Sequence, residues 1–159
     1  MKQKDKELLF KDLCARLPYG VKCSFGVDDA IYVIEWINPN CCGASEIQAT
    51  HIKSGINGDF TINACKPYLF PLSSMIEKQV YYIYEYYTDT SVYEFDEFYK
   101  KFLRGKDDIN ILFTSCSFLF DYLNKNHFDY RGLIPMGLAI DCTNLNIYWL
   151  WLDIIKDSG

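Results

Sequence analysis

The stretch that decides the fold runs from residue 21 to residue 64 and reads VKCSFGVDDAIYVIEWINPNCCGASEIQATHIKSGINGDFTINA. Alternating, β-branched and aromatic residues dominate it, and short runs rich in Gly, Asn and Asp interrupt it, as is typical of short strands joined by turns. Four strands are therefore predicted, at residues 21–25, 30–37, 46–53 and 59–64. The spacing indicates a small antiparallel β meander, which either stays open or closes into a barrel.

Helical patterns flank this stretch. Residues 4–17 carry leucines at spacings of three and four, and Pro18 and Gly20 end the pattern. Residues 66–71 contain two prolines, which predict an extended segment that leaves the sheet. Further helices are predicted over residues 74–87, 96–103 and 117–126, and a further strand over residues 109–113.

The predicted start of the helix at residue 74 rests on a capping box. Ser74 stands three positions before Glu77, and this pair can satisfy two free backbone N–H groups reciprocally. The composition of residues 80–87, VYYIYEYY, favours a strand instead. We expect a helix and not a strand, because the capping box defines the residue at which a helix would begin.

These elements predict an α+β fold in a single domain, residues 1–159. An N-terminal helix and a β region occupy residues 1–71, and a helical region with an apolar C-terminal tail occupies residues 72–159. The tail, residues 147–155, reads IYWLWLDII and is too short to span a bilayer, so we expect it to be buried or paired with a partner.

Charge and composition narrow the classes of function. The net charge of −5 argues against a protein that binds nucleic acid through a basic face, and no transmembrane segment is predicted. The charged start of the chain does not resemble a secretory signal, and the seven cysteines are an odd number. Free, mostly buried thiols in a reducing cytoplasm are therefore expected.

The most unusual cluster is a run of tyrosines at positions 81, 82, 84, 86 and 87, in a chain with 13 Tyr and 11 Phe. Acidic residues surround it, which suits a basic protein surface better than a nucleic acid. The alternative is that the rings pack on the β region. The predicted partner-binding residues are Tyr82, Glu85, Tyr86, Glu94 and Glu97.

A second cluster comprises His127, Asp129, Tyr130 and Arg131. A histidine near a carboxylate can transfer protons, and an arginine can hold a phosphate, so the cluster is a candidate ligand site. The structural alternative is a helix exit, in which His127 binds the last helical carbonyls, Asp129 caps the next turn and Arg131 pairs with an acid. No complete catalytic set accompanies the cluster, which favours the structural alternative.

A zinc site is not predicted. Cys41 and Cys42 are adjacent, and neighbouring side chains of an extended segment point to opposite faces, so the two thiols would not meet one ion. No C-x₂-C pair exists, and no cofactor motif such as a P-loop is present. Cys116 has no recognisable activating partner and is expected to be a buried thiol.

Three segments of the chain are distinctive as phrases, namely KDLCARLPYGVKC (11–23), KPYLFPLSSM (66–75) and FDYLNKNHFDYRGLIPMGLAIDCTNLNIY (120–148). Together they resemble a family of short uncharacterised proteins carried by phages, prophages and mobile elements of gut anaerobic bacteria, and they imply the cytoplasm of a bacterial host or a virion as the location. The chain departs from that pattern at Asn126-His127, where the family often has paired histidines, and at residues 134–136. The resemblance implies a phage or mobile-element origin and no particular reaction.

The sequence thus predicts a non-enzymatic accessory protein without a cofactor. It would act by contacts with a host or phage protein or with a second copy of itself, as a host-directed modulator or a virion accessory. Two alternatives remain open. One is a ligand-binding or nucleotide-hydrolysing protein centred on His127, Asp129 and Arg131, and the other is a structural protein that self-associates through residues 147–155.

Overall fold

The computed structural model describes residues 1–26, 30–38, 46–87, 94–104 and 117–148. Four helices are described, with bounds α1 Gln3–Arg16, α2 Glu77–Tyr87, α3 Phe95–Arg104 and α5 Ser117–Lys125. The strands are β1 Lys22–Ser24, β2 Tyr32–Ile37, β3 Ile47–His51, β4 Asn57–Phe60, β5 Lys66–Pro71, β6 Phe128–Asp129 and β7 Ile140–Asp141. Short 3₁₀ turns lie at Leu17–Tyr19, Ile62–Ala64 and Leu72–Ser74.

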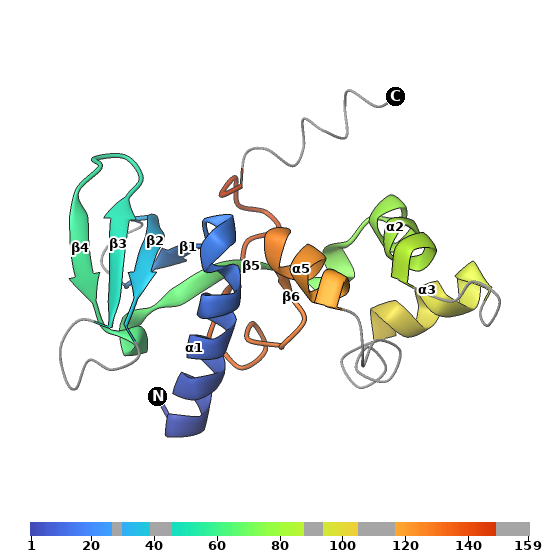
Figure 1. Ribbon diagram of the computed structural model, residues 1–159, viewed down its shortest axis with the longest axis horizontal. Coiled ribbons are helices and arrows are strands. Elements are labelled where there is room, and N and C mark those ends of the chain that lie inside the picture. The colour runs from blue at the N-terminus through green and yellow to red at the C-terminus, as the bar shows by residue number, and fades with distance from the viewer. Residues whose placement is uncertain (27–29, 39–45, 88–93, 105–116, 149–159) are drawn as a thin grey trace.

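Within the described residues the strands form one seven-stranded sheet in the order β4-β3-β2-β1-β5-β6, with β7 also paired to β5. Strands β1 to β4 form the predicted antiparallel meander, whereas β6 and β7 run parallel to β5. The sheet stays open, so the open form is the one observed of the two alternatives that the sequence left. Figure 1 shows the meander at one end of the molecule, α2 and α3 at the other, and β5 between them.

The two prolines predicted that residues 66–71 leave the sheet, and this prediction is wrong. The segment is strand β5, which pairs with β1 of the meander on one side and with β6 on the other. A proline lacks only its own backbone donor, and this strand pairs through its neighbours. The N–H of Phe70 donates to the carbonyl of His127 at 2.9 Å, and the carbonyl of Leu69 accepts from Cys142 at 2.9 Å.

The helices predicted near residues 4–17, 96–103 and 117–126 are confirmed as α1, α3 and α5. The predicted helix that includes residues 80–87 is α2, but its capping box is wrong. The Ser74 hydroxyl donates to the carbonyl of Pro71 instead, and the Gln79 side chain accepts the N–H of Ile76 at 3.0 Å. The strand predicted at residues 109–113 lies outside the described residues.

The C-terminal half is not mainly helical, contrary to prediction. After α5 the chain forms β6, a series of turns and β7. These short strands could not be recognised from alternation, because each is two residues long and depends on pairing with β5.

Two main cores hold the fold. The first lies between α1 and the meander, where Leu9 and Leu13 are fully buried. Its strand and turn members include Val21, Cys23, Phe25, Ile34, Ile47, Ala49, Ile62 and Cys65. The second lies between α2, α3 and α5 and contains Met75, Val80, Ile83, Phe98, Leu119, Leu123 and Phe128. Each large apolar side chain buried in this way contributes about 1.5–3 kcal/mol before entropy is counted.

None of the helices in the described part of the chain has both the length and the apolar character that a membrane crossing requires.

Candidate functional site

The first candidate site is an aromatic surface at the end of the molecule formed by the helices. Tyr81 and Tyr82 of α2 are 45% and 41% exposed, and Phe118 in the first turn of α5 is 70% exposed. The ring of Tyr82 stacks on Tyr122 with centroids 5.4 Å apart, and Tyr122 lies one helical turn from Phe118. We call Tyr81, Tyr82, Phe118 and Tyr122 the aromatic surface.

The choice of side chains that α2 buries explains why Tyr81 and Tyr82 remain exposed at the surface. Val80 and Ile83 are fully buried and fill the positions that face the second core. Tyr84 packs on α3, with its ring 5.4 Å from those of Phe95 and Phe98. A helix buries one such stripe, so Tyr81 and Tyr82 project from its flanks. The rings of Tyr81, Tyr82 and Tyr84 contact rings of the neighbouring helices α3 and α5.

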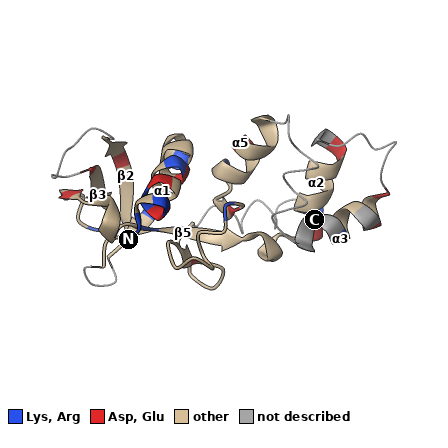
Figure 2. Cartoon of the chain, turned by 90° about the horizontal axis from the view of Figure 1, so that it is seen from below, with Lys and Arg blue, Asp and Glu red and all other residues tan. Residues whose placement is uncertain are grey.

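An acidic rim adjoins the aromatic surface. The carboxylate of Glu85, one turn after Tyr81, accepts a hydrogen bond from that phenol and raises its pKa, chiefly through this bond. Glu94 and Asp96, at the start of α3, are exposed beside Phe95, whose ring lies 5.0 Å from that of Tyr81. Figure 2 shows acidic residues on α2 and α3 and a mixture of both charges on α1.

The structure thus places three of the five predicted partner-binding residues, Tyr82, Glu85 and Glu94, on α2 and at the start of α3. The side chains of the other two, Tyr86 and Glu97, lie outside the described part. Tyr81 and Phe118 were not among the predicted residues. The four-residue spacings of Tyr81 from Glu85 and of Phe118 from Tyr122 were the signals that could have found them.

The second candidate site is the corner that holds His127, Asp129, Tyr130 and Arg131, and its side chains do not converge on one point. Both carboxylate oxygens of Asp129 accept backbone N–H groups, from Leu133 and Ile134, each at 2.8 Å. Asp129 thus caps the following turn, as its structural alternative predicted.

Arg131 points the other way, toward α1. Its Nε donates to Asp12 at 3.1 Å, and its Nη2 donates to the hydroxyl of Tyr130 at 2.7 Å. The predicted pairing of Arg131 with an acid is therefore present. The Tyr130 hydroxyl in turn donates to Asn124 of α5 at 3.1 Å.

Asp12 also binds Arg16, a fully buried arginine that sequence reasoning missed. Two nitrogens of Arg16 donate to the Asp12 carboxylate at 2.7 and 3.1 Å, and Nη2 reaches the carbonyl of Phe128 at 2.8 Å. The spacing of four between Asp12 and Arg16 was the available signal. This network ties α1 to the turn after α5, so these charges hold the two halves together.

His127 is buried under the ring of Tyr148. The two rings stack with centroids 4.0 Å apart and planes 15° apart, and the backbone of His127 has a positive φ of 56°. Burial, with the charges of Arg16 and Lys22, lowers the pKa of His127 from 6.5 to about 3. Its ring is neutral, and Nδ1 has no hydrogen-bond partner, so the predicted bonds from the ring to the last helical carbonyls are not what holds it.

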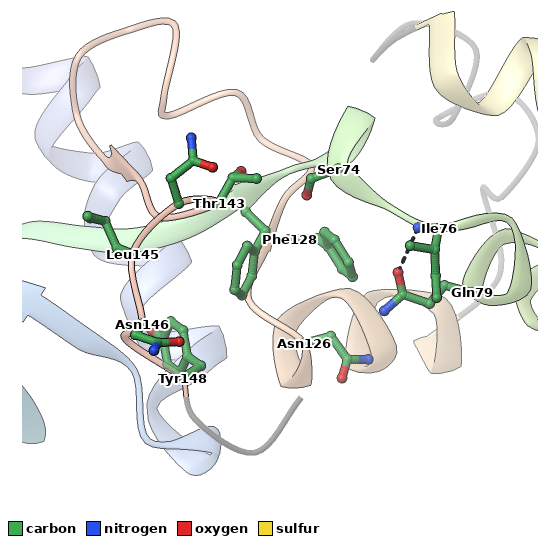
Figure 3. A pocket seen from close by; sticks show the side chains of 11 residues that line it. Ser74, Ile76, Gln79, Asn126, Phe128, Thr143, Leu145, Asn146 and Tyr148 are labelled. Carbon is green, nitrogen blue, oxygen red and sulfur yellow. Dashed lines mark hydrogen bonds between the residues drawn. The ribbon is translucent and has the colours of Figure 1, made fainter. Parts of the chain in front are cut away.

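A cleft of about 430 Å³ opens beside this stack. Aromatic rings of Phe70, Phe128 and Tyr148 line it, and Figure 3 shows the polar side chains around them. These polar residues are Ser74, Gln79, Asn126, Thr143, Asn144 and Asn146. His127, Asp129 and Arg131 are not among the lining residues.

The cysteines give no metal centre in the described part of the chain, where no group of three or more potential ligands is found. Cys23 and Cys65 are both fully buried neighbours in the first core, and burial raises the pKa of the Cys23 thiol. Cys41, Cys42 and Cys116 lie outside the described residues.

Comparisons with known proteins were made at three levels. No family model, no curated protein and no solved structure matches this chain.

Proposed function

We propose that this chain is a non-enzymatic accessory protein of a phage or mobile element that acts by binding another protein through the aromatic surface. The observation that carries the proposal is the exposure of Tyr81, Tyr82 and Phe118 at 45%, 41% and 70% on adjoining helices. Tyrosine and phenylalanine are enriched at protein interfaces, where their rings supply large contact areas. The origin rests on the resemblance alone.

The acidic rim suggests the chemistry of the partner. Glu85, Glu94 and Asp96 are exposed beside the aromatic surface, and an acidic rim favours a partner with basic residues around an apolar centre. We expect such a complex to form more slowly at high salt, because the rim charges are screened while the apolar contact is not. The bacterial cytoplasm is the compartment that this proposal requires.

Capture from a bacterial host lysate, followed by mass spectrometry, tests the proposal. The wild-type chain is compared with the double variant Tyr81→Ala/Tyr82→Ala and with Trp36→Ala, which removes a ring that is 50% exposed on β2, in the other half. The expected result is one retained protein whose binding falls by about tenfold or more in the double variant and is unchanged by Trp36→Ala. Equal retention by both variants, or no retained protein, contradicts the proposal.

Self-association is a second candidate, in which the partner is another copy of the chain. Of the tail predicted as its interface, Ile147 is buried and Tyr148 is half-buried inside this chain, so neither is free to form it. Residues 149–155 lie outside the described part. Light scattering of the wild-type chain distinguishes a dimer from a monomer, and a dimer that the double variant abolishes would place a second copy on the aromatic surface.

The ligand site centred on His127, Asp129 and Arg131 receives less support. The carboxylate of Asp129 is used by backbone N–H groups, and Arg131 is used by Asp12 and Tyr130. A nucleotide would have to displace these bonds before it could bind.

A further inference from the structure

The cleft beside Tyr148 has a composition that suits one class of ligand. Its volume of about 430 Å³ falls within the range of small-molecule sites, about 300–1,000 Å³. The eleven described residues that line it are uncharged: three are aromatic, two are aliphatic, and the remaining six carry amides or hydroxyls. Such a lining offers apolar faces together with groups that both donate and accept hydrogen bonds.

Two of the amides are fixed in orientation by bonds to the backbone. The Oε1 atom of Gln79 accepts the N–H of Ile76 at 3.0 Å, which retains its NH₂ group as a donor (Figure 3). The Nδ2 atom of Asn126 donates to the carbonyl of Tyr122 at 2.8 Å, which retains its oxygen as an acceptor. The walls of the cleft therefore present a positioned donor and a positioned acceptor, and such preorganisation reduces the entropy lost on binding.

The aromatic floor is also fixed. The ring of Phe70 lies 6.1 Å from Phe128 and 5.9 Å from Tyr148. The hydroxyl of Tyr148 accepts the N–H of Lys22 at 3.0 Å and donates to the carbonyl of Tyr68 at 3.1 Å. These bonds anchor the phenol away from any ligand, so Tyr148 contributes its ring to the cleft.

In the described part of the chain the nearby cations already have partners, although the ammonium of Lys22 lies only 5.1 Å from the centroid of the Tyr148 ring. The ammonium of Lys22 donates to the carbonyl of Ile147 at 2.6 Å, and Arg16 and Arg131 bind Asp12 on the side of α1. A phosphate or carboxylate in the cleft would lose its hydration without meeting an opposite charge in the lining, which is unfavourable. The described lining therefore favours a neutral ligand over an anionic one.

We propose that this cleft binds an uncharged ring compound that has one apolar face and an edge of hydroxyl or amide groups. Neutral nucleosides and neutral sugars share this chemistry: aromatic rings stack on the apolar face, while Gln79 and Asn126 bind the edge. The site is separate from the aromatic surface and does not depend on the protein-binding proposal.

Titrations followed by ¹⁵N–¹H spectra test the proposal and identify the source of the ligand. The neutral arms are adenosine, uridine, glucose and N-acetylglucosamine, and the charged counterparts are AMP, UMP, glucose 6-phosphate and N-acetylglucosamine 6-phosphate. The expected result is that at least one neutral compound binds about tenfold or more tightly than its phosphorylated counterpart. Binding by a nucleoside or by a sugar then assigns the class.

Two variants locate the binding. Leu145→Trp enlarges a side chain on the rim that is 44% exposed, so it fills the cleft without disturbing a core. Asn63→Ala removes an exposed amide outside the cleft and is the matched control. Binding should be lost in Leu145→Trp and retained in Asn63→Ala. The proposal is overturned if no neutral compound binds at millimolar concentration, if the phosphorylated forms bind equally well, or if Leu145→Trp binds like the wild type.

Discussion

The two cores of this molecule treat their aromatic residues differently. In the first core, α1 covers the meander, and Phe25 is buried. Its ring stacks on that of Phe60, with the two ring centroids 3.8 Å apart. In the second, α2, α3 and α5 share a cluster rich in tyrosine and phenylalanine, yet Tyr81, Tyr82 and Phe118 remain exposed. A sheet covered by a helix can bury one continuous face, whereas three short helices leave flanks uncovered. These exposed flanks are the surface on which we propose that the contacts with another protein are made.

The two regions are joined by buried charges as well as by β5. Arg16 and Asp12 come from α1 in the first region, and their partners include the carbonyl of Phe128 and the guanidinium of Arg131 in the second. We therefore expect the two regions to unfold together as one cooperative unit.

The largest effect is expected for Arg16→Ala. Removal of a fully buried guanidinium takes one of its donors from the carbonyl of Phe128, which still accepts the N–H of Tyr130, and leaves Asp12 with one partner fewer. We expect a loss of about 3–5 kcal/mol in the free energy of unfolding, because a buried ion pair is broken. Urea denaturation measures it, with the exposed Lys11→Ala on α1 as the control, expected within about 0.5 kcal/mol of wild type. A small loss, or separate unfolding of the two regions in hydrogen exchange of the wild type, would break the idea that these charges join them.

The next largest effect is expected for Asp129→Ala. The buried N–H of Leu133 and the N–H of Ile134 lose a charged acceptor, which lowers the free energy of unfolding by about 2–3 kcal/mol. Asp129→Asn keeps one acceptor oxygen and should lose about half as much. If both variants are as stable as wild type, Asp129 has no structural role and the ligand hypothesis for this corner regains support.

His127 should make the stability depend on pH. Its pKa is about 3 in the folded chain and about 6.5 when unfolded, so the unfolded state takes up the proton first as the pH falls. Stability is therefore complete above about pH 6.5 and decreases toward pH 3, by about 2 kcal/mol at about pH 5. Denaturation at several pH values measures this.

His127→Asn is the matched variant, because asparagine tolerates the positive φ of this position and does not titrate. Its stability should be nearly constant between about pH 6.5 and pH 5, where few carboxylates change charge. A variant with the same pH dependence as wild type would show that the effect arises at another group.

The smallest effect on stability is expected at the aromatic surface. Tyr82→Ala removes a stacked but 41% exposed ring, at a loss of about 1 kcal/mol or less. Thermal unfolding measures it, and Ile83→Ala, at the fully buried neighbouring position, should lose about 2–5 kcal/mol. If Tyr82→Ala is as damaging as Ile83→Ala, the ring is part of the core, and the contrast between the two regions is lost.

The sequence by itself determined the α+β class, the N-terminal helix, the four-stranded meander and the positions of three further helices. Those features depend on local periodicity and turn residues, which act over a few neighbouring positions. It also indicated the structural role of Asp129, because a cap acts on nearby backbone groups.

Only the tertiary structure decided the rest. The strand β5 forms despite its prolines because β1, β6 and β7 supply its partners from distant parts of the chain. The burial of Arg16 likewise requires α1 to meet β6, 112 residues away in the chain. The stacking of His127 on Tyr148 requires the end of α5 to meet the segment that follows β7. The cleft is assembled from residues of β5, the start of α2, β6 and the loop before Tyr148. A local sequence pattern does not predict which distant segments come into contact, because the free energy of such contacts arises from packing between the segments and not within each of them.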